Sequence, residues 1–248
     1  MNCMNKEYII ASPPLSKSTG VKVLHLLYVH LQRRGERVSL LDTGFRIPGF
    51  NYVSEITEAI KENAIIVYPE IVPGNPLEIK NVVRYVLNYP GLLGGNKEYH
   101  PSEFIITHHP IFYPDAFKLT IPWIDKALFF DDNSAKTQDC CFVYKGGRFR
   151  EFPEAEGTVE INMSYPETKE ELANLLRTTK TLYSFDDCSS ILGEAQLCGA
   201  EVKIVTKDGF KDFVSDYEEL IADFEEKMEA FITLTQQMNY TGPIEKQP

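Results

Sequence analysis

Short apolar runs alternate with segments of helical periodicity along this chain, and no other feature of the sequence constrains the fold as strongly. In the first half, the apolar runs lie at 8–11, 38–41, 64–68 and 104–107, and the helical periods between them at 18–35, 56–63 and 77–88. Buried strands separated by helices are typical of βαβ units, which form parallel sheets covered by helices. The alternation therefore predicts an α/β fold.

A polar stretch at 131–139 interrupts the alternation, and a second series follows it. Strand-like runs lie at 141–144, 159–163, 181–184 and 202–205, and helical segments at 166–178 and 189–198. We therefore expect a first domain over 1–130 and a second over 140–213, since both lengths suit a domain. An apolar stripe predicts a long helix over 214–238, and the polar residues 239–248 predict a disordered tail.

The composition excludes several classes of function. The formal net charge is -11, so the phosphate backbone of a nucleic acid would be repelled. No apolar run approaches the ~20 residues that a bilayer span requires. The first residues lack a signal peptide, which predicts a cytoplasmic protein. The five cysteines form no CxxC pair and show no ligand spacing with the five histidines, so we expect free thiols and no metal.

The most informative segment is 183–200, YSFDDCSSILGEAQLCGA, which is typical of a strand end, an acidic turn and a helix. Parallel sheets bind ligands at the carboxyl ends of their strands, and the N–H groups at a helix start suit a diphosphate. Glu194, more than a turn inside the helix, could hold a ribose diol, and Asp186 could face a sugar ring. Taken alone, this spacing favours a simpler interpretation, in which Asp186 or Asp187 is an N-cap and Glu194 is a solvated helix residue.

The whole pattern resembles the donor-site signature of GT-B glycosyltransferases, in which an acidic residue, seven others and a Glu precede Ala and then Gly. This sequence has Asp186 where the family usually has Glu, and Asp-Cys-Ser at 187–189 where it usually has Pro, an aromatic residue and Gly. The segment 18–38 is similar to the first loop and helix of a GT-B acceptor lobe, and the segments 68–91 and 165–176 are similar to bacterial surface-polysaccharide and rhamnan-type members. The resemblance implies two Rossmann-like lobes with parallel sheets, a nucleotide-sugar site in the cleft between them, and a C-terminal helix that crosses back to the first lobe.

The resemblance also implies roles for residues of the second lobe. Glu194 would hold the ribose, and the backbone amides of Ser189 and Ser190 the diphosphate. Lys145 and Arg148 flank two glycines and would neutralise the leaving diphosphate without a metal or other cofactor. From the residues alone, a Gly-Gly hairpin with solvated charges is an equal alternative for that loop.

Other candidates lie in the first half of the chain. His108, at the end of the run 104–107, matches the His that many family members present to the donor sugar, and with Asp186 it would orient that sugar. A loop histidine with ordinary hydrogen bonds is the alternative. Gly20 lies in a segment that resembles the first loop and helix of an acceptor lobe. Glu70 is a candidate for acceptor contact, or for fixing the loop at 74–75.

The resulting expectation is a glycosyltransferase of polysaccharide biosynthesis. It would move a hexose or deoxyhexose from a nucleoside diphosphate to a glycan or lipid-linked glycan acceptor, and the acidic signature is commoner among retaining enzymes. The chain is short for this family, so a catalytically weak sugar-nucleotide-binding or scaffold protein is the alternative. Arg33 and Arg34 suit a helix C-terminus, and leave open peripheral contact with the inner face of a membrane. A homodimer also stays open. An oxidoreductase would need a GxGxxG turn, which 16–20 does not supply.

Overall fold

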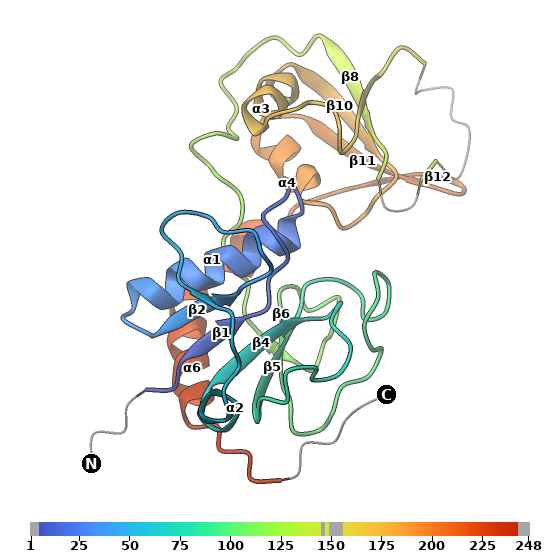
Figure 1. Ribbon diagram of the computed structural model, residues 1–248. Coiled ribbons are helices and arrows are strands. Elements are labelled where there is room, and N and C mark those ends of the chain that lie inside the picture. Colours follow the sequence, from blue (N-terminus) through green and yellow to red (C-terminus); the bar gives the residue numbers. More distant parts are fainter. Residues whose placement is uncertain (1–4, 145–146, 149–155, 243–248) are drawn as a thin grey trace. The chain divides into compact units, whose positions relative to one another are not determined.

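The computed structural model describes residues 5–144, 147–148 and 156–242 (Figure 1). Contacts between residues divide the chain into two units, which we call unit 1 (Met1–Trp123 with Leu220–Pro248) and unit 2 (Ile124–Glu219). The boundary after Trp123 comes before the polar stretch 131–139. Each unit is built on a mainly parallel sheet, so the predicted α/β class with two parallel sheets is confirmed.

Unit 1 contains a seven-stranded sheet in the order β3-β2-β1-β4-β5-β6-β7, with every neighbouring pair parallel. The strands are β1 (Tyr8–Ile10), β2 (Val38–Leu41), β3 (Tyr52–Val53), β4 (Ile65–Pro69), β5 (Asn81–Val86), β6 (Phe104–Thr107) and β7 (Phe117–Lys118). The helices of this unit are α1 (Thr19–Arg33), α2 (Glu58–Asn63) and α6 (Phe224–Gln236). The strand order reverses between β1 and β4, and ligands of open α/β sheets bind beside such a reversal.

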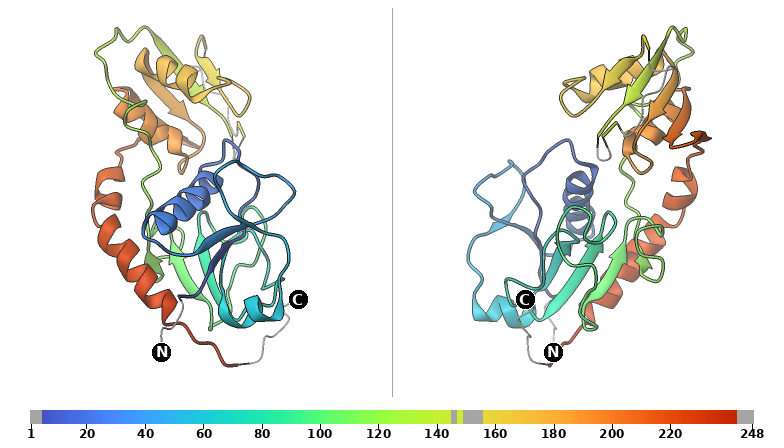
Figure 2. Two further views of the ribbon diagram at one scale, coloured as in Figure 1. Left: turned by 60° about the vertical axis from the view of Figure 1, so that its left-hand side comes forward. Right: turned by 90° about the vertical axis from the view of Figure 1, so that its right-hand side faces the viewer.

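The two faces of this sheet are covered by different helices. Apolar side chains of α1 and α6, including Leu27 and Phe231, pack with Ile10 on one face. Figure 2 shows α6 running along this face of the sheet. On the other face Ile9 packs with Ile60 of α2. Because side chains alternate along a strand, the adjacent residues Ile9 and Ile10 serve opposite cores.

Two of the predicted helical segments differ in the structure. The period at 77–88 is strand β5, and all six of its residues are buried. Since both faces of β5 are covered, its apolar residues need not alternate, and their spacing imitates a helix. The helix expected over 214–238 is divided into α5 (Tyr217–Ile221) and α6. Part of the tail expected over 239–248, from 243 onward, lies outside the described residues.

Unit 2 contains a five-stranded sheet in the order β12-β11-β10-β8-β9, parallel except for the β11–β12 pair. The strands are β8 (Gln138–Phe142), β9 (Val159–Ile161), β10 (Thr179–Ser184), β11 (Glu201–Thr206) and β12 (Gly209–Asp212), and the helices are α3 (Lys169–Arg177) and α4 (Ser190–Leu197). The chain runs outward from β8 to β9 and returns through α3 to β10. The strand order therefore reverses between β8 and β10, which is where such sheets bind ligands.

The local signals of unit 2 match the observed elements closely. The capping box of α3 is present: Thr168 Oγ1 accepts from the Glu171 amide at 3.1 Å, and Glu171 Oε2 accepts from the Thr168 amide at 3.1 Å. Strand β10 is followed by a turn and then α4, as the segment 183–200 predicts. None of the helices within the described ranges is long and apolar enough to cross a membrane.

Candidate functional site

The turn between β10 and α4 carries a buried acid at the reversal of strand order in unit 2. Asp186 is 5% exposed and follows Ser184, the last residue of β10, which lies beside Phe142 at the end of β8. The Ser184 hydroxyl accepts from the Asp186 amide at 3.1 Å and donates to its carbonyl at 2.6 Å. The carboxylate is thus held at the carboxyl ends of two neighbouring parallel strands.

The two oxygens of this carboxylate differ in their contacts. Oδ1 accepts from the Cys188 amide at 3.1 Å and lies 3.5 Å from the Cys188 thiol. Oδ2 is buried and has no hydrogen-bond partner among the residues that the structure describes. A buried charged oxygen without a donor costs free energy, because it loses water without replacing it. Asp186 is therefore the residue of this turn whose chemistry calls for a ligand.

Helix α4 begins four residues after Asp186 and offers a second binding element. Ser189, the N-cap, is extended (φ -99°, ψ 144°), and in the described part of the chain its side chain does not cap the helix. By contrast, Thr57 and Thr168 cap α2 and α3 through their hydroxyl groups. The first amides of a helix have no partners within it and carry partial positive charge. The start of α4, at Ser189 and Ser190, can therefore receive an anion.

Glu194 lies in the second turn of α4 and is 3% exposed, so the interpretation as a solvated helix residue is wrong. Both of its oxygens accept hydrogen bonds from Lys169 Nζ, at 2.8 and 3.0 Å. The Lys169 side chain is 40% exposed, and its ammonium group lies 5.4 Å from the Phe129 ring centroid. Sequence reasoning missed Lys169, since 25 residues separate it from Glu194. A carboxylate has further lone pairs, so this ion pair leaves Glu194 able to accept from a ligand.

The glycine loop after β8 is described only in part. Lys145 lies outside the described residues, whereas Arg148 lies within them. Its guanidinium donates to Glu160 of β9 at 2.9 Å, and both side chains are largely exposed. Arg148 thus follows the end of β8 and is engaged by an acidic residue of its own sheet.

His108 lies in unit 1 at the end of β6 and is buried. Tyr85 donates its hydroxyl hydrogen to the Leu119 carbonyl, at 2.5 Å, so its oxygen receives Nδ1–H of His108, at 3.3 Å. Nε2 is buried without a hydrogen-bond partner in the described ranges, and the ring packs on Trp123 with centroids 4.8 Å apart. Burial lowers the pKa of His108 to about 3, so its imidazole is neutral at physiological pH.

The remaining candidates, Gly20 and Glu70, also lie in unit 1. A Cβ at Gly20 would lie 3.6 Å from Leu87, an ordinary contact, so packing does not require glycine in α1. Glu70 follows β4 and is buried, and its Oε2 accepts from the Leu87 amide at 3.0 Å, which joins the ends of β4 and β5. Arg84 contacts the loop at 74–75, where it donates to the Gly74 carbonyl at 2.7 Å, and a role of Glu70 in fixing this loop stays a prediction.

One group of residues has the spacing of a metal site. Ligand atoms of Asp186, Asp187 and Cys188 lie within 4.8 Å of one another, and this is the one such group that the described residues contain. Asp187 is exposed and Cys188 half-buried. Because the three residues belong to a single turn, their proximity follows from their sequence positions, and the absence of a metal requirement stays a prediction.

Comparisons with known proteins give little further information. No protein-family model matches the chain, and no curated protein matches its sequence. Among solved structures, the chain is similar to an α-glucosyltransferase in complex with UDP and a 13-mer DNA containing an HMU base, at 12% sequence identity and a TM-score of 0.49. The similarity covers 95% of this chain and 94% of that one. Similarity at this level carries no inference about activity.

Proposed function

We propose that the protein is a glycosyltransferase whose donor, a nucleoside-diphosphate sugar, binds unit 2 at the carboxyl ends of β8 and β10. Oδ2 of Asp186, which is buried and has no hydrogen-bond partner among the described residues, carries this proposal. A sugar ring presents several hydroxyl groups, which donate hydrogen bonds without bringing another negative charge to a buried carboxylate. Sugar hydroxyls therefore satisfy this oxygen better than a phosphate or a carboxylate ligand would.

The start of α4 is where the diphosphate would bind. Its first amides follow Asp186 closely along the chain, and among the described residues the Ser189 side chain makes no capping hydrogen bond to them. We assign the diphosphate to the amides of Ser189 and Ser190, because partial positive charge at a helix start stabilises phosphate. The sugar would then lie at Asp186 and the phosphates at the helix.

Glu194 and Arg148 would complete the donor site. The ribose diol would donate to Glu194, whose carboxylate Lys169 holds in one orientation. Arg148 would have to leave Glu160 to neutralise the leaving diphosphate, and an exposed ion pair of this kind is worth only about 0–1 kcal/mol. A diphosphate can therefore compete for the guanidinium. Lys145 is proposed for the same task from the sequence alone.

The remaining parts of the proposed reaction are supported by the sequence alone. The transferred group is a hexose or deoxyhexose, the acceptor a surface glycan or its lipid-linked precursor, and the reaction needs no metal. His108 is neutral and enclosed, so any part it has in orienting the sugar would be through Nε2 as a hydrogen-bond acceptor. Gly20 and Glu70 stay proposed acceptor-side residues.

Calorimetry with matched pairs of ligands tests this proposal. UDP, GDP and dTDP are titrated into the full chain, followed by the glucose conjugate of whichever binds best. We expect Asp186→Asn to bind the diphosphate as the wild type does and to lose the extra affinity of the sugar conjugate. Asp208→Asn, an exposed acid in the β11–β12 turn, is the control and should change neither value. If none of the three diphosphates binds, or if Asp186→Asn changes nothing, the proposal fails.

A sugar-nucleotide-binding protein without turnover is the second candidate. The enclosure of His108 favours it, because Nε2 is buried and the ring packs on Trp123, which leaves this nitrogen poorly placed to orient a donor sugar. Release of free sugar from the conjugate, measured alongside its binding, separates the two functions. Binding without release would select the second.

A further inference from the structure

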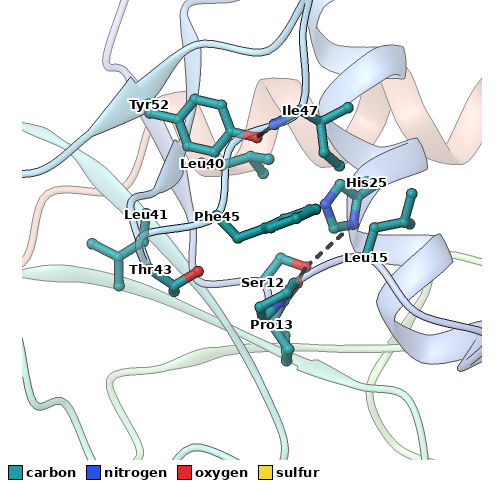
Figure 3. A pocket seen from close by; sticks show the side chains of 11 residues that line it. Ser12, Pro13, Leu15, His25, Leu40, Leu41, Thr43, Phe45, Ile47 and Tyr52 are labelled. Atoms are coloured by element: carbon teal, nitrogen blue, oxygen red, sulfur yellow. Dashed lines mark hydrogen bonds between the residues drawn. The ribbon is translucent and has the colours of Figure 1, made fainter.

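One pocket of unit 1, shown in Figure 3, is too small for a nucleotide or a sugar ring. Its lining includes Ser12, His25 and Phe45, and it has room for about one water molecule. The Ser12 hydroxyl and Nδ1 of His25 lie within hydrogen-bond distance of each other, at 3.3 Å. This pocket is therefore not a second site for the ligands of unit 2.

In unit 2, Lys169 is the first residue of α3 and carries a charge that its own helix does not need. Thr168 caps this helix, so Lys169 lies in the first turn, where the backbone amides give partial positive charge. A cation at that end destabilises a helix, whereas the acids Glu170 and Glu171, which follow it, stabilise the helix. The position of Lys169 is therefore better explained by what its ammonium group contacts.

The ammonium group of Lys169 uses two of its three hydrogens on one carboxylate. It donates to both oxygens of Glu194, at 2.8 and 3.0 Å, and within the described ranges it makes no other hydrogen bond. The Lys169 side chain is 40% exposed and that of Glu194 only 3%, so the lysine forms the solvent side of the pair. A ligand can therefore accept from the third hydrogen without breaking the ion pair.

The geometry of α4 brings this ammonium group toward the start of that helix. Glu194 comes four residues after Ser190, so the two lie on one face of α4, one helical turn or about 5.4 Å apart. Side chains of a helix lean toward its N-terminus, which brings the Glu194 carboxylate and its partner Lys169 closer to Ser190. A ribose diol is separated from the phosphate on its own C5′ by a similar length. A nucleotide with its ribose at Glu194 would therefore have its first phosphate within reach of Lys169.

We propose that Lys169 binds the phosphate next to the ribose and so selects nucleotides over nucleosides, a role that rests on the proposed function. One ammonium group joins the acid that holds the ribose diol to the phosphate that the same ribose carries. It supplies a local positive charge on a chain whose net charge of -11 otherwise disfavours an anion. A nucleoside offers only the diol and gains nothing from the third hydrogen. Lys169 thus sets the difference in affinity between the two kinds of ligand.

Titrations of a nucleoside diphosphate and of its own nucleoside into the full chain test this role. The diphosphate is UDP, GDP or dTDP, whichever binds the wild type best. Lys169→Met should weaken binding of the diphosphate by about fivefold relative to the nucleoside, the effect of one lost exposed ion pair. Lys169→Arg keeps the charge and should keep the wild-type ratio of affinities. If Lys169 only orients Glu194, Lys169→Met weakens both ligands alike and the ratio does not change.

Lys126→Met is the matched control. Lys126 also belongs to unit 2, its side chain is 49% exposed, and it pairs with Glu218 at 2.5 Å. Its ammonium group lies 5.6 Å from the Tyr217 ring centroid, much as that of Lys169 lies 5.4 Å from Phe129. Because neither Lys126 nor Glu218 belongs to the proposed donor site, this change should alter neither affinity.

NMR of the wild type with ¹³C-labelled lysine keeps the test independent of whether Lys169→Met folds. The ε-methylene signal of Lys169, assigned by its loss in Lys169→Arg, should shift more with the diphosphate than with the nucleoside. Equal shifts with a diphosphate that binds, or an unchanged affinity ratio in folded Lys169→Met, would overturn the role of Lys169 and leave the donor proposal intact. If none of the three diphosphates binds the wild type, both proposals fail.

Discussion

The ion pair of Glu194 and Lys169 allows a donor-binding role to be separated from a structural one. Glu194→Gln keeps the shape of the side chain but replaces one acceptor oxygen with an amide donor. If the ribose diol donates to both oxygens, this change removes one hydrogen bond to a charged group, worth about 1.5–3 kcal/mol. Affinity for the nucleoside diphosphate should therefore fall by roughly 10- to 150-fold, at about 1.4 kcal/mol per factor of ten.

For stability, the change at Lys169 should cost more than the change at Glu194, whereas for affinity the change at Glu194 should cost more. Glu194 is 3% exposed and the Lys169 side chain 40% exposed, so the lysine can return to water when its partner is neutralised. Glu194→Gln should then lower the free energy of unfolding by about 1 kcal/mol or less. Lys169→Met instead leaves a buried carboxylate without its cation, and should cost more, up to about 3–5 kcal/mol.

Urea denaturation and calorimetry on both variants measure these quantities. With UDP, GDP or dTDP, whichever binds the wild type best, we expect Glu194→Gln to lose more affinity and Lys169→Met to lose more stability. A purely structural Glu194 would give one ranking in both assays, with the less stable variant binding worse. Folded Glu194→Gln with wild-type affinity would refute the assignment of this carboxylate to the ribose.

Two further predictions concern unit 1. Arg84 donates to the buried Glu103 carboxylate at 2.8 and 3.2 Å. Arg84→Met leaves that carboxylate without a counter-charge, so it should lower the free energy of unfolding by about 3–5 kcal/mol in urea denaturation. His108 has a pKa of about 3 in the folded protein against 6.5 ordinarily, so the unfolded state binds the extra proton. Stability should fall as pH drops from about 6.5, by at most about 1.4 kcal/mol per pH unit, and His108→Gln should reduce that slope.

The sequence predicts those parts of the fold that depend on neighbours along the chain. The Thr168–Glu171 capping box, the strand predicted at 181–184 and the helix predicted at 189–198 need only local signals. The structure contains the capping box, β10 at Thr179–Ser184 and α4 at Ser190–Leu197. The helix predicted at 77–88 is wrong for a physical reason, because this segment contains strand β5. Its six buried residues face two covered sides, and a fully buried strand has no alternation that would distinguish it from a buried helix.

Some residues of the candidate site could be found from local sequence signals, and others could not. The turn and helix that carry Asp186 and Glu194 could be found because both lie within one local motif. Lys169 could not, since its partner Glu194 is distant in sequence.

The buried acids of this chain show why Asp186, rather than Glu194, carries the functional proposal. An acid that only stabilises a fold needs donors for both oxygens, and Glu103 and Glu194 each have them, from Arg84 and Lys169. Asp186 is buried to the same degree, but within the described residues one of its oxygens has none. Folding alone would select against that arrangement, because it costs free energy and returns no contact. A ligand that supplies the missing donor resolves the cost, and the position of Asp186 at the reversal of strand order is where such a ligand would bind.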